Sequence, residues 1–173
     1  MVTATPVAPV ASSAPTPSAA PAAEKPVICP EHVFCQVDAT SKEEALDFLA
    51  RQGEALGLAR SHDALRESFL AREALGSTGC VEGLAIPHAK CTAVTRPAVC
   101  LAKFSQPVEW GSLDGKPVTC AVALFVPEGQ AGTTHLKLLS KIAVLTSQDE
   151  FGAFIGSTND PEAISDYLFS RLA

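Results

Sequence analysis

The order of hydrophobic and polar positions predicts strands in the middle of the chain. The nine residues from Val118 to Val126 include eight that are apolar or Cys, which predicts a central strand covered on both faces. A partly alternating run over 98–104 predicts a second strand. A third is expected over 81–86, which is apolar apart from Glu82. We therefore expect these strands to form a single β-sheet.

Helical patterns flank these strands on both sides. Ser41 followed by Glu44 has the form of a capping box, so we expect a helix over about 42–52 that ends near Gly53. Further helices are expected over 61–73, 134–147, 149–156 and 161–172. Helices before and after a sheet can cover both of its faces, so the pattern predicts a three-layer α/β domain.

The composition divides the 173 residues into an arm and one domain. Residues 1–26 are mostly Ala, Pro, Ser, Thr and Val, with no charged residue before Glu24. Such a segment cannot bury a face, so we expect a disordered or polyproline-like arm or linker. Residues 27–173 are expected to form a single domain.

Charge and hydropathy exclude several classes of function. The formal net charge is −6 and no basic cluster stands out in the sequence, so nucleic-acid binding is not expected. No apolar run is long enough to span a bilayer and no signal peptide is visible, so we expect a cytoplasmic protein without membrane insertion.

The cysteines do not indicate a disulfide framework or a metal site. They are Cys29, Cys35, Cys80, Cys91, Cys100 and Cys120, and no two of them form a Cys-x-x-Cys pair. Cys80, His88 and Cys91 match no common zinc spacing, so zinc is only a minor alternative. No cofactor and no metal are expected.

The candidate chemistry lies at Pro87 and His88. Pro87 lacks an N–H and fixes its own φ, so His88 is expected on a stiff backbone just past a strand end. There a ring nitrogen can be held at one point, as a nucleophile requires. The alternative is a buried histidine satisfied by a hydrogen bond, which is the commoner case for a single His.

Three other residues are candidates to meet His88. Arg72 lies at a predicted helix end and carries a guanidinium suited to phosphate oxygens. Thr78 offers a hydroxyl on the following loop. His135 starts the helix after the central strand, where the helix N-terminus favours an anion. Alone, each also fits a plain structural or surface role.

The combination of motifs resembles a known family. Arg72-Glu73-Ala74, Ser77-Thr78-Gly79 and the run from Gly83 to His88, Gly-Leu-Ala-Ile-Pro-His, are similar to the type-2 EIIA domain of the bacterial phosphoenolpyruvate-dependent sugar phosphotransferase system. This is the fructose, mannitol and nitrogen-regulatory class. The segment 108–118 is similar to the fructose-type version, and the strand up to Pro127 and the helix from His135 also agree.

The resemblance implies a fold, a reaction and partners. It implies a single mixed β-sheet with helices on both faces. His88 would be the phosphohistidine acceptor, taking a phosphoryl group from the carrier protein HPr. It would pass this group to an EIIB domain, which works with a membrane EIIC component in sugar uptake of the fructose type. His135 would hydrogen-bond the phosphate and Arg72 would lie near it, with Thr78 as a further phosphate-stabilising candidate. No cofactor is implied.

The alternative function is a nitrogen-type regulatory EIIA whose phosphorylation state controls binding to partners outside transport. A domain of this fold that has lost the chemistry is disfavoured by the joint presence of His88, Arg72 and His135. The docking surface around the histidine should be apolar, and Ala85, Ile86 and Ala89 are its candidates.

Overall fold

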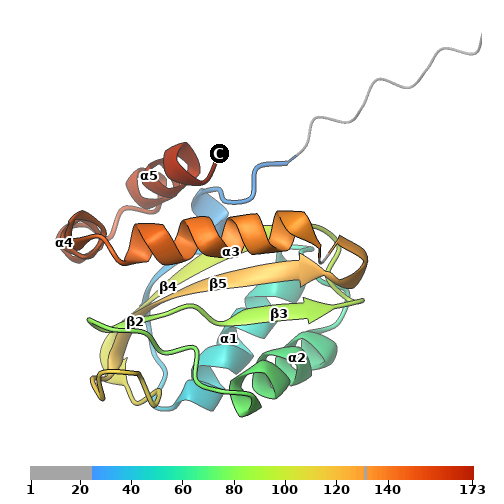
Figure 1. The fold of residues 1–173 in the computed structure, drawn as a ribbon, viewed down its shortest axis with the longest axis horizontal. Helices are drawn as coiled ribbons and strands as arrows, with labels where there is room; N and C mark the ends of the chain where they lie inside the picture. Colours follow the sequence, from blue (N-terminus) through green and yellow to red (C-terminus); the bar gives the residue numbers. More distant parts are fainter. Residues whose placement is uncertain (1–24, 131) are drawn as a thin grey trace, which may run out of the picture.

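A single five-stranded mixed sheet between two layers of helices makes up the fold (Figure 1). The computed structural model describes residues 25–130 and 132–173, so most of the expected arm lies outside the described residues. The elements in chain order are η1 (Pro30–His32), β1 (Val33–Val37), α1 (Lys42–Ala55), α2 (His62–Ala74), β2 (Leu84–Ala85), β3 (His88–Cys91), β4 (Ala98–Val108), β5 (Val118–Pro127), η2 (Glu128–Gln130), α3 (Thr133–Thr146), α4 (Asp149–Ser157) and α5 (Pro161–Leu172).

The strand order is β1-β4-β5-β2, and β3 also pairs with β5. β4 runs antiparallel to β5, whereas β2 and β3 both run parallel to it along the same edge. β1 pairs in parallel with β4. The predicted α/β three-layer sandwich with a mixed sheet is therefore confirmed.

Each face of the sheet has its own hydrophobic core. Helices α1 and α2 cover one face and α3, α4 and α5 cover the other (Figure 1). Side chains along β5 alternate between the two cores: Phe125 packs with α1 and α2, whereas Leu124 and Val126 pack with α3 and α5. This alternation follows from the two-residue period of a strand, and it explains the continuous apolar run of the central strand.

The predicted helix starts are confirmed by their caps. The Ser41 hydroxyl accepts from the Glu44 N–H at 3.2 Å, and the Ser61 hydroxyl accepts from the Ala64 N–H at 3.1 Å. The Asp160 carboxylate accepts from the Glu162 N–H at 3.0 Å. The described residues contain no helix that is both long and apolar enough to cross a membrane.

The predicted end of the first helix is wrong. α1 continues past Gly53 to Ala55. Gly53 is buried, and a Cβ there would lie 2.7 Å from the Leu65 side chain and 2.8 Å from the Phe125 ring. The glycine therefore permits close packing of α1 against α2 and the sheet, rather than ending the helix.

The predicted strand over 81–86 is also wrong in its first half. β2 contains only Leu84 and Ala85. Glu82 and Gly83 both have positive φ, at 55° and 75°, and successive positive values form the tight turn of a hairpin. The Cys80 N–H donates to the Leu84 carbonyl at 2.8 Å and closes that hairpin.

His88 follows the end of β2, as expected, and also opens a strand of its own. β3 begins at His88 and pairs with β5, with His88 opposite Leu124. Pro87 separates β2 from β3, and its carbonyl still accepts from the Leu124 N–H at 2.9 Å. Proline is tolerated here because the position lies on a sheet edge. Neither β1 nor β3 was predicted, and β4 extends beyond 104 to Val108.

Candidate functional site

Two hydrogen bonds determine the tautomer of His88. Its Nδ1 lies 2.9 Å from the carbonyl oxygen of Ile86, and the Arg72 Nε lies 2.9 Å from its Nε2. A carbonyl oxygen only accepts and a guanidinium only donates. Nδ1 must therefore carry the hydrogen, and Nε2 must keep its lone pair. His88 is a neutral imidazole with Nε2 as its available nucleophilic atom.

The surroundings keep His88 neutral. Burial lowers the pKa of the His88 ring below its ordinary value, and the Ile86 carbonyl opposes this by stabilising the protonated ring. The Arg72 charge lowers the pKa further. Because only the neutral ring has a lone pair, this shift favours the nucleophilic form near neutral pH.

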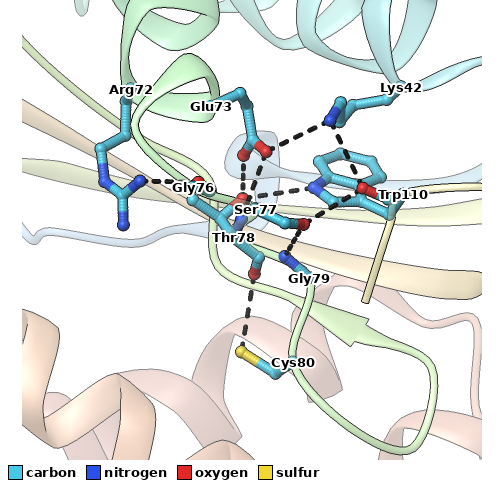
Figure 2. Close-up of polar contacts among 9 residues, drawn as sticks. All are labelled: Lys42, Arg72, Glu73, Gly76, Ser77, Thr78, Gly79, Cys80 and Trp110. Carbon is cyan, nitrogen blue, oxygen red and sulfur yellow. Dashed lines mark hydrogen bonds and ion pairs between the residues drawn. The ribbon is translucent and has the colours of Figure 1, made fainter. Parts of the chain in front are cut away.

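Arg72 reaches His88 from the last turn of α2. Its side chain is held at a second point, because one terminal nitrogen donates to the Gly76 carbonyl at 2.8 Å (Figure 2). The guanidinium thus bridges the end of α2 and the ring of His88, which lies in β3. The predicted meeting of Arg72 and His88 is present in the structure.

His135 approaches His88 from the first turn of α3. The two ring centroids lie 6.2 Å apart and the rings are inclined by 49°. Burial lowers the pKa of the His135 ring, and the neighbouring His88 and Lys90 side chains lower it further. Its Nδ1 is buried and has no hydrogen-bond partner among residues 25–130 and 132–173. The structure therefore brings His88, Arg72 and His135 together.

Thr78 does not join them. Its hydroxyl donates to the carboxylate of Glu73 and accepts from the Trp110 indole N–H at 3.2 Å. The Thr78 backbone N–H also donates to Glu73, at 3.2 Å. A hydroxyl whose one hydrogen goes to Glu73 has none left for a phosphate, so Thr78 has a different partner from the one expected of it.

A buried polar network holds the loop that links α2 to the hairpin (Figure 2). Glu73 has 9% of its surface exposed and faces Lys42, whose Nζ lies 3.5 Å from its carboxylate. Lys42 also donates to the Trp110 carbonyl at 3.4 Å, and the Ser77 hydroxyl donates to the same carbonyl at 3.1 Å. This network fixes the backbone immediately after Arg72.

The surface around the histidine differs from the prediction. Ala85 and Ala89 are fully buried and Ile86 is nearly so, so the expectation that they form an apolar docking surface is wrong. They face the two cores because they alternate along the strands. Large exposed apolar side chains lie instead beside the other site residues. Leu75 directly follows α2 and is 85% exposed, and Leu136 follows His135 and is 63% exposed.

Nearby cysteines do not complete a metal site. The Cys80 thiol donates to the Thr78 carbonyl at 3.5 Å, and burial raises the pKa of that thiol. Across 25–130 and 132–173, no group of three or more His, Cys, Asp or Glu side chains is arranged to hold a metal ion.

The arrangement suits attack on an anionic electrophile. A neutral imidazole offers one lone pair, a permanent guanidinium covers it, and a second imidazole lies across from it. Phosphoryl transfer needs mainly positioning and stabilisation of charge on the phosphoryl oxygens. Sequence reasoning missed the Ile86 carbonyl and the Glu73 network. Neither has a sequence signal, since one is a backbone atom and the other depends on burial.

The sequence is similar to a known protein family and to several known proteins. The family model for the phosphoenolpyruvate-dependent sugar phosphotransferase system, EIIA 2, matches residues 27–170. The 2-O-alpha-mannosyl-D-glycerate-specific EIIABC component of Escherichia coli K12 is 39% identical over 130 residues, which cover 75% of this chain and 20% of that protein. A nitrogen regulatory protein of Bradyrhizobium diazoefficiens is 33% identical over 142 residues, which cover 82% of this chain and 92% of that protein.

Solved structures share the fold. The crystal structure of the nitrogen regulatory protein IIA-Ntr from Neisseria meningitidis superposes with a TM-score of 0.75 and 28% identity. The superposition covers 85% of this chain and 97% of that one. The chain thus spans nearly the whole of two compact relatives, but only about a fifth of the larger EIIABC component.

Proposed function

The chain belongs to the EIIA 2 family of the phosphoenolpyruvate-dependent sugar phosphotransferase system, and from that premise we propose that it is a phosphocarrier. In this proposal His88 accepts a phosphoryl group from phosphorylated HPr and passes it to an EIIB domain that serves a membrane EIIC. The single observation that carries the proposal is the pair of hydrogen bonds that leaves Nε2 of His88 with its lone pair.

The transfer begins with a movement of Arg72. Its Nε–H covers the lone pair of Nε2 at 2.9 Å, so the guanidinium must move aside before phosphorus can approach. The Nε2–P bond then forms as the N–P bond of the donor phosphohistidine breaks, and that bonding pair returns to the donor ring. The displaced guanidinium stays tethered to Gly76, beside the new phosphoryl oxygens.

His135 is the proposed second contact to the phosphoryl group. With its ring centroid 6.2 Å from that of His88, an imidazole N–H can donate to a phosphoryl oxygen on Nε2. Positive charge from Arg72 and a donor from His135 would act from different elements, α2 and α3. The dianionic phosphoryl group would in turn raise the pKa of His135, because a nearby negative charge favours the protonated ring.

Partner docking is the proposed role of the exposed leucines. Leu75 and Leu136 lie within a few residues of Arg72 and His135. Large exposed apolar side chains beside a site favour contact with another protein. Such a contact would exclude water from the two reacting rings, which strengthens the electrostatic terms.

The test is phosphorylation of the purified chain with enzyme I, HPr and phosphoenolpyruvate. We expect one phosphoryl group per chain by intact mass spectrometry, and its loss after addition of an EIIB domain. The His88→Ala variant should take up none. The His62→Ala variant is the matched control, since His62 lies at the first position of α2 with its ring 2.8 Å from Asp47, and it should label normally. Equal labelling of His88→Ala would contradict the proposal.

The segment 108–118 is the basis for proposing which sugar the chain helps to take up. That segment resembles the fructose-type version, so we propose an EIIB of the fructose type as the first acceptor to assay. The EIIABC relative serves 2-O-alpha-mannosyl-D-glycerate, so its EIIB domain is the second. The faster of the two transfers identifies the route, and no transfer to either would contradict a role in uptake of these sugars.

A second candidate function is regulation, and similarity to nitrogen regulatory proteins favours it. The Bradyrhizobium nitrogen regulatory protein is 33% identical to the chain over 142 residues, and the IIA-Ntr structure from Neisseria meningitidis superposes on it with a TM-score of 0.75. In this proposal the phosphorylation state of His88 controls binding to a partner outside transport. Affinity capture with His88→Ala and with the phosphomimetic His88→Asp separates the two functions. A non-transport partner held by one variant only, with no transfer to any EIIB, supports regulation; identical partners for both variants would contradict it.

A further inference from the structure

A groove on the α3 side of the molecule gathers four positive charges. It has a volume of about 610 Å³ and is lined by Lys25, Arg96, Lys137 and Lys141. These come from the start of the described chain, the segment between β3 and β4, and one face of α3; Figure 1 shows that start, in blue, beside α3 and the C-terminus. Because these segments are far apart in the sequence, the sequence itself shows no basic cluster. We call this site the cationic groove.

No acidic side chain balances the charges of the cationic groove. No Asp or Glu lines it. Among the described residues, none of its four cations pairs with an Asp or Glu side chain, whereas Lys42, Arg51, Arg66 and Lys116 elsewhere on the surface all do. Lys137 and Lys141 are four residues apart on one helix, a spacing at which like charges repel. An anion placed between them would relieve that repulsion.

Two of the cations are held in place. One terminal nitrogen of Arg96 donates to the Pro26 carbonyl at 3.0 Å, which leaves its other N–H groups to face a ligand. The Lys141 ammonium donates to the Leu172 carbonyl at 3.2 Å and to a backbone oxygen of Ala173, the last residue of the sequence, at 2.9 Å. Side chains already held by the protein lose little entropy when they bind an anion.

The floor of the cationic groove is apolar. Leu138 and Leu172 are buried, and Val27 and Pro97 are partly buried around them. A bare inorganic anion would not use this surface. A ligand that combines a phosphate chain with a flat apolar group would use both the charges and the floor, and the volume lies within the range of small-molecule sites.

We propose that the cationic groove binds a nucleoside di- or triphosphate. Its phosphates would contact Arg96, Lys137 and Lys25, and its base would lie against Val27 and Leu138. An acidic peptide or an anionic membrane surface is a poorer fit, because its charged groups would leave the buried apolar floor of Leu138 and Leu172 unused. The site does not use His88, so it is separate from the proposed phosphocarrier function.

The test is isothermal titration of the full unphosphorylated chain at low salt without Mg²⁺. We expect saturable binding of ATP or ADP, with adenosine and pyrophosphate each at least about tenfold weaker, because each retains only half of the contacts. Added NaCl should weaken nucleotide binding. Binding should be the same in His88→Ala, so a failure of the phosphocarrier function leaves this result intact.

The variant Arg96→Gln/Lys137→Gln should raise the dissociation constant at least about tenfold. The control Arg51→Gln/Lys116→Gln removes the same two residue types from positions outside the groove, and it should change the constant less than twofold. Circular dichroism and thermal unfolding check that both variants are folded. Amide shifts of Leu138 and Val27 on titration place the ligand in the groove.

Several results would overturn the proposal. The first is a lack of saturable ATP or ADP binding below about 1 mM. The second is pyrophosphate binding as tight as ATP binding. The third is an equal loss of nucleotide affinity in the two double variants. Tighter binding of a polyglutamate peptide, or of vesicles that contain phosphatidylglycerol, would assign the cationic groove to those partners instead.

Discussion

Arg72 donates a hydrogen bond from Nε to Nε2 of His88 across 2.9 Å. Its permanent positive charge therefore lies directly beside the ring nitrogen that keeps its lone pair. The guanidinium therefore covers the lone pair of the proposed nucleophile. The same contact lowers the pKa of His88 after the larger effect of burial. One side chain thus both covers this nitrogen and helps to keep the ring neutral.

Replacing Arg72 by Lys tests the geometry of this contact. Lysine keeps the charge but loses the planar guanidinium that reaches His88 and Gly76 together. We expect phosphorylation of His88 by phosphorylated HPr to slow by about a hundredfold. The measurement is a rapid-quench time course. Arg66→Lys, on the same helix but paired with Asp47 at 3.3 Å, is the control. Equal rates for both variants would show that charge alone suffices.

The pH dependence of His88 follows from its lowered pKa. Burial disfavours the protonated ring, and the Arg72 charge disfavours it further. The nucleophilic form should therefore persist below the ordinary histidine pKa of about 6.5 and be lost only as pH falls through the lower value in the folded protein. NMR titration of the His88 ring and phosphorylation rates against pH should report the same transition.

The Arg72→Gln variant completes that titration. Removing the guanidinium charge should raise the pKa of His88 relative to the wild type, while burial keeps it from rising fully to the ordinary value. A His88 ring that titrates at or above pH 6.5 in the wild type would contradict this account. So would an unchanged pKa in Arg72→Gln.

Glu73 should stabilise the fold as well as the site. Its carboxylate accepts from the Thr78 backbone and hydroxyl and faces Lys42. Glu73→Ala leaves these groups without a partner in a buried place, so we expect a loss of about 2–4 kcal/mol in the free energy of unfolding. Urea denaturation measures it. Glu67→Ala, exposed on the same helix, should change stability little, and a similar small effect of Glu73→Ala would rule out this role.

Gly53 gives a prediction of opposite sign from the usual helix rule. In an open helix, alanine in place of glycine stabilises by about 0.5–1 kcal/mol. A Cβ at Gly53 would lie 2.7 Å from Leu65 and 2.8 Å from Phe125, so Gly53→Ala should destabilise by about 1–3 kcal/mol. Gly152→Ala, in α4 with nothing within 4 Å of a new Cβ, should stabilise. If both variants were stabilised, the packing account of Gly53 would be wrong.

Much of the fold was predictable because it depends on local patterns. The apolar run of β5 and the caps at Ser41, Ser61 and Asp160 were read correctly from the sequence. β1 was missed because it is five residues long and Gln36 within it has a φ of 58°. The end of α1 was misjudged because the role of Gly53 depends on Leu65 and Phe125, which are distant in the sequence.

The site was predictable only in part, for a similar reason. The motif residues Arg72, His88 and His135 do meet. The Thr78 hydroxyl turns away because Glu73 and Trp110 are its partners, and such burial is not visible in a motif. The acceptor that sets the tautomer of His88 is the backbone carbonyl of Ile86, whose direction no side-chain pattern encodes.

The position of β3 on an open edge of the sheet has a consequence for solubility. A strand edge with free N–H and C=O groups is a template on which another chain can add a strand and begin to aggregate. Here Pro87 removes one N–H just before His88, β3 is only four residues long, and the Ser68 hydroxyl takes the Lys90 carbonyl. The edge that carries His88 is therefore poorly suited to intermolecular strand pairing.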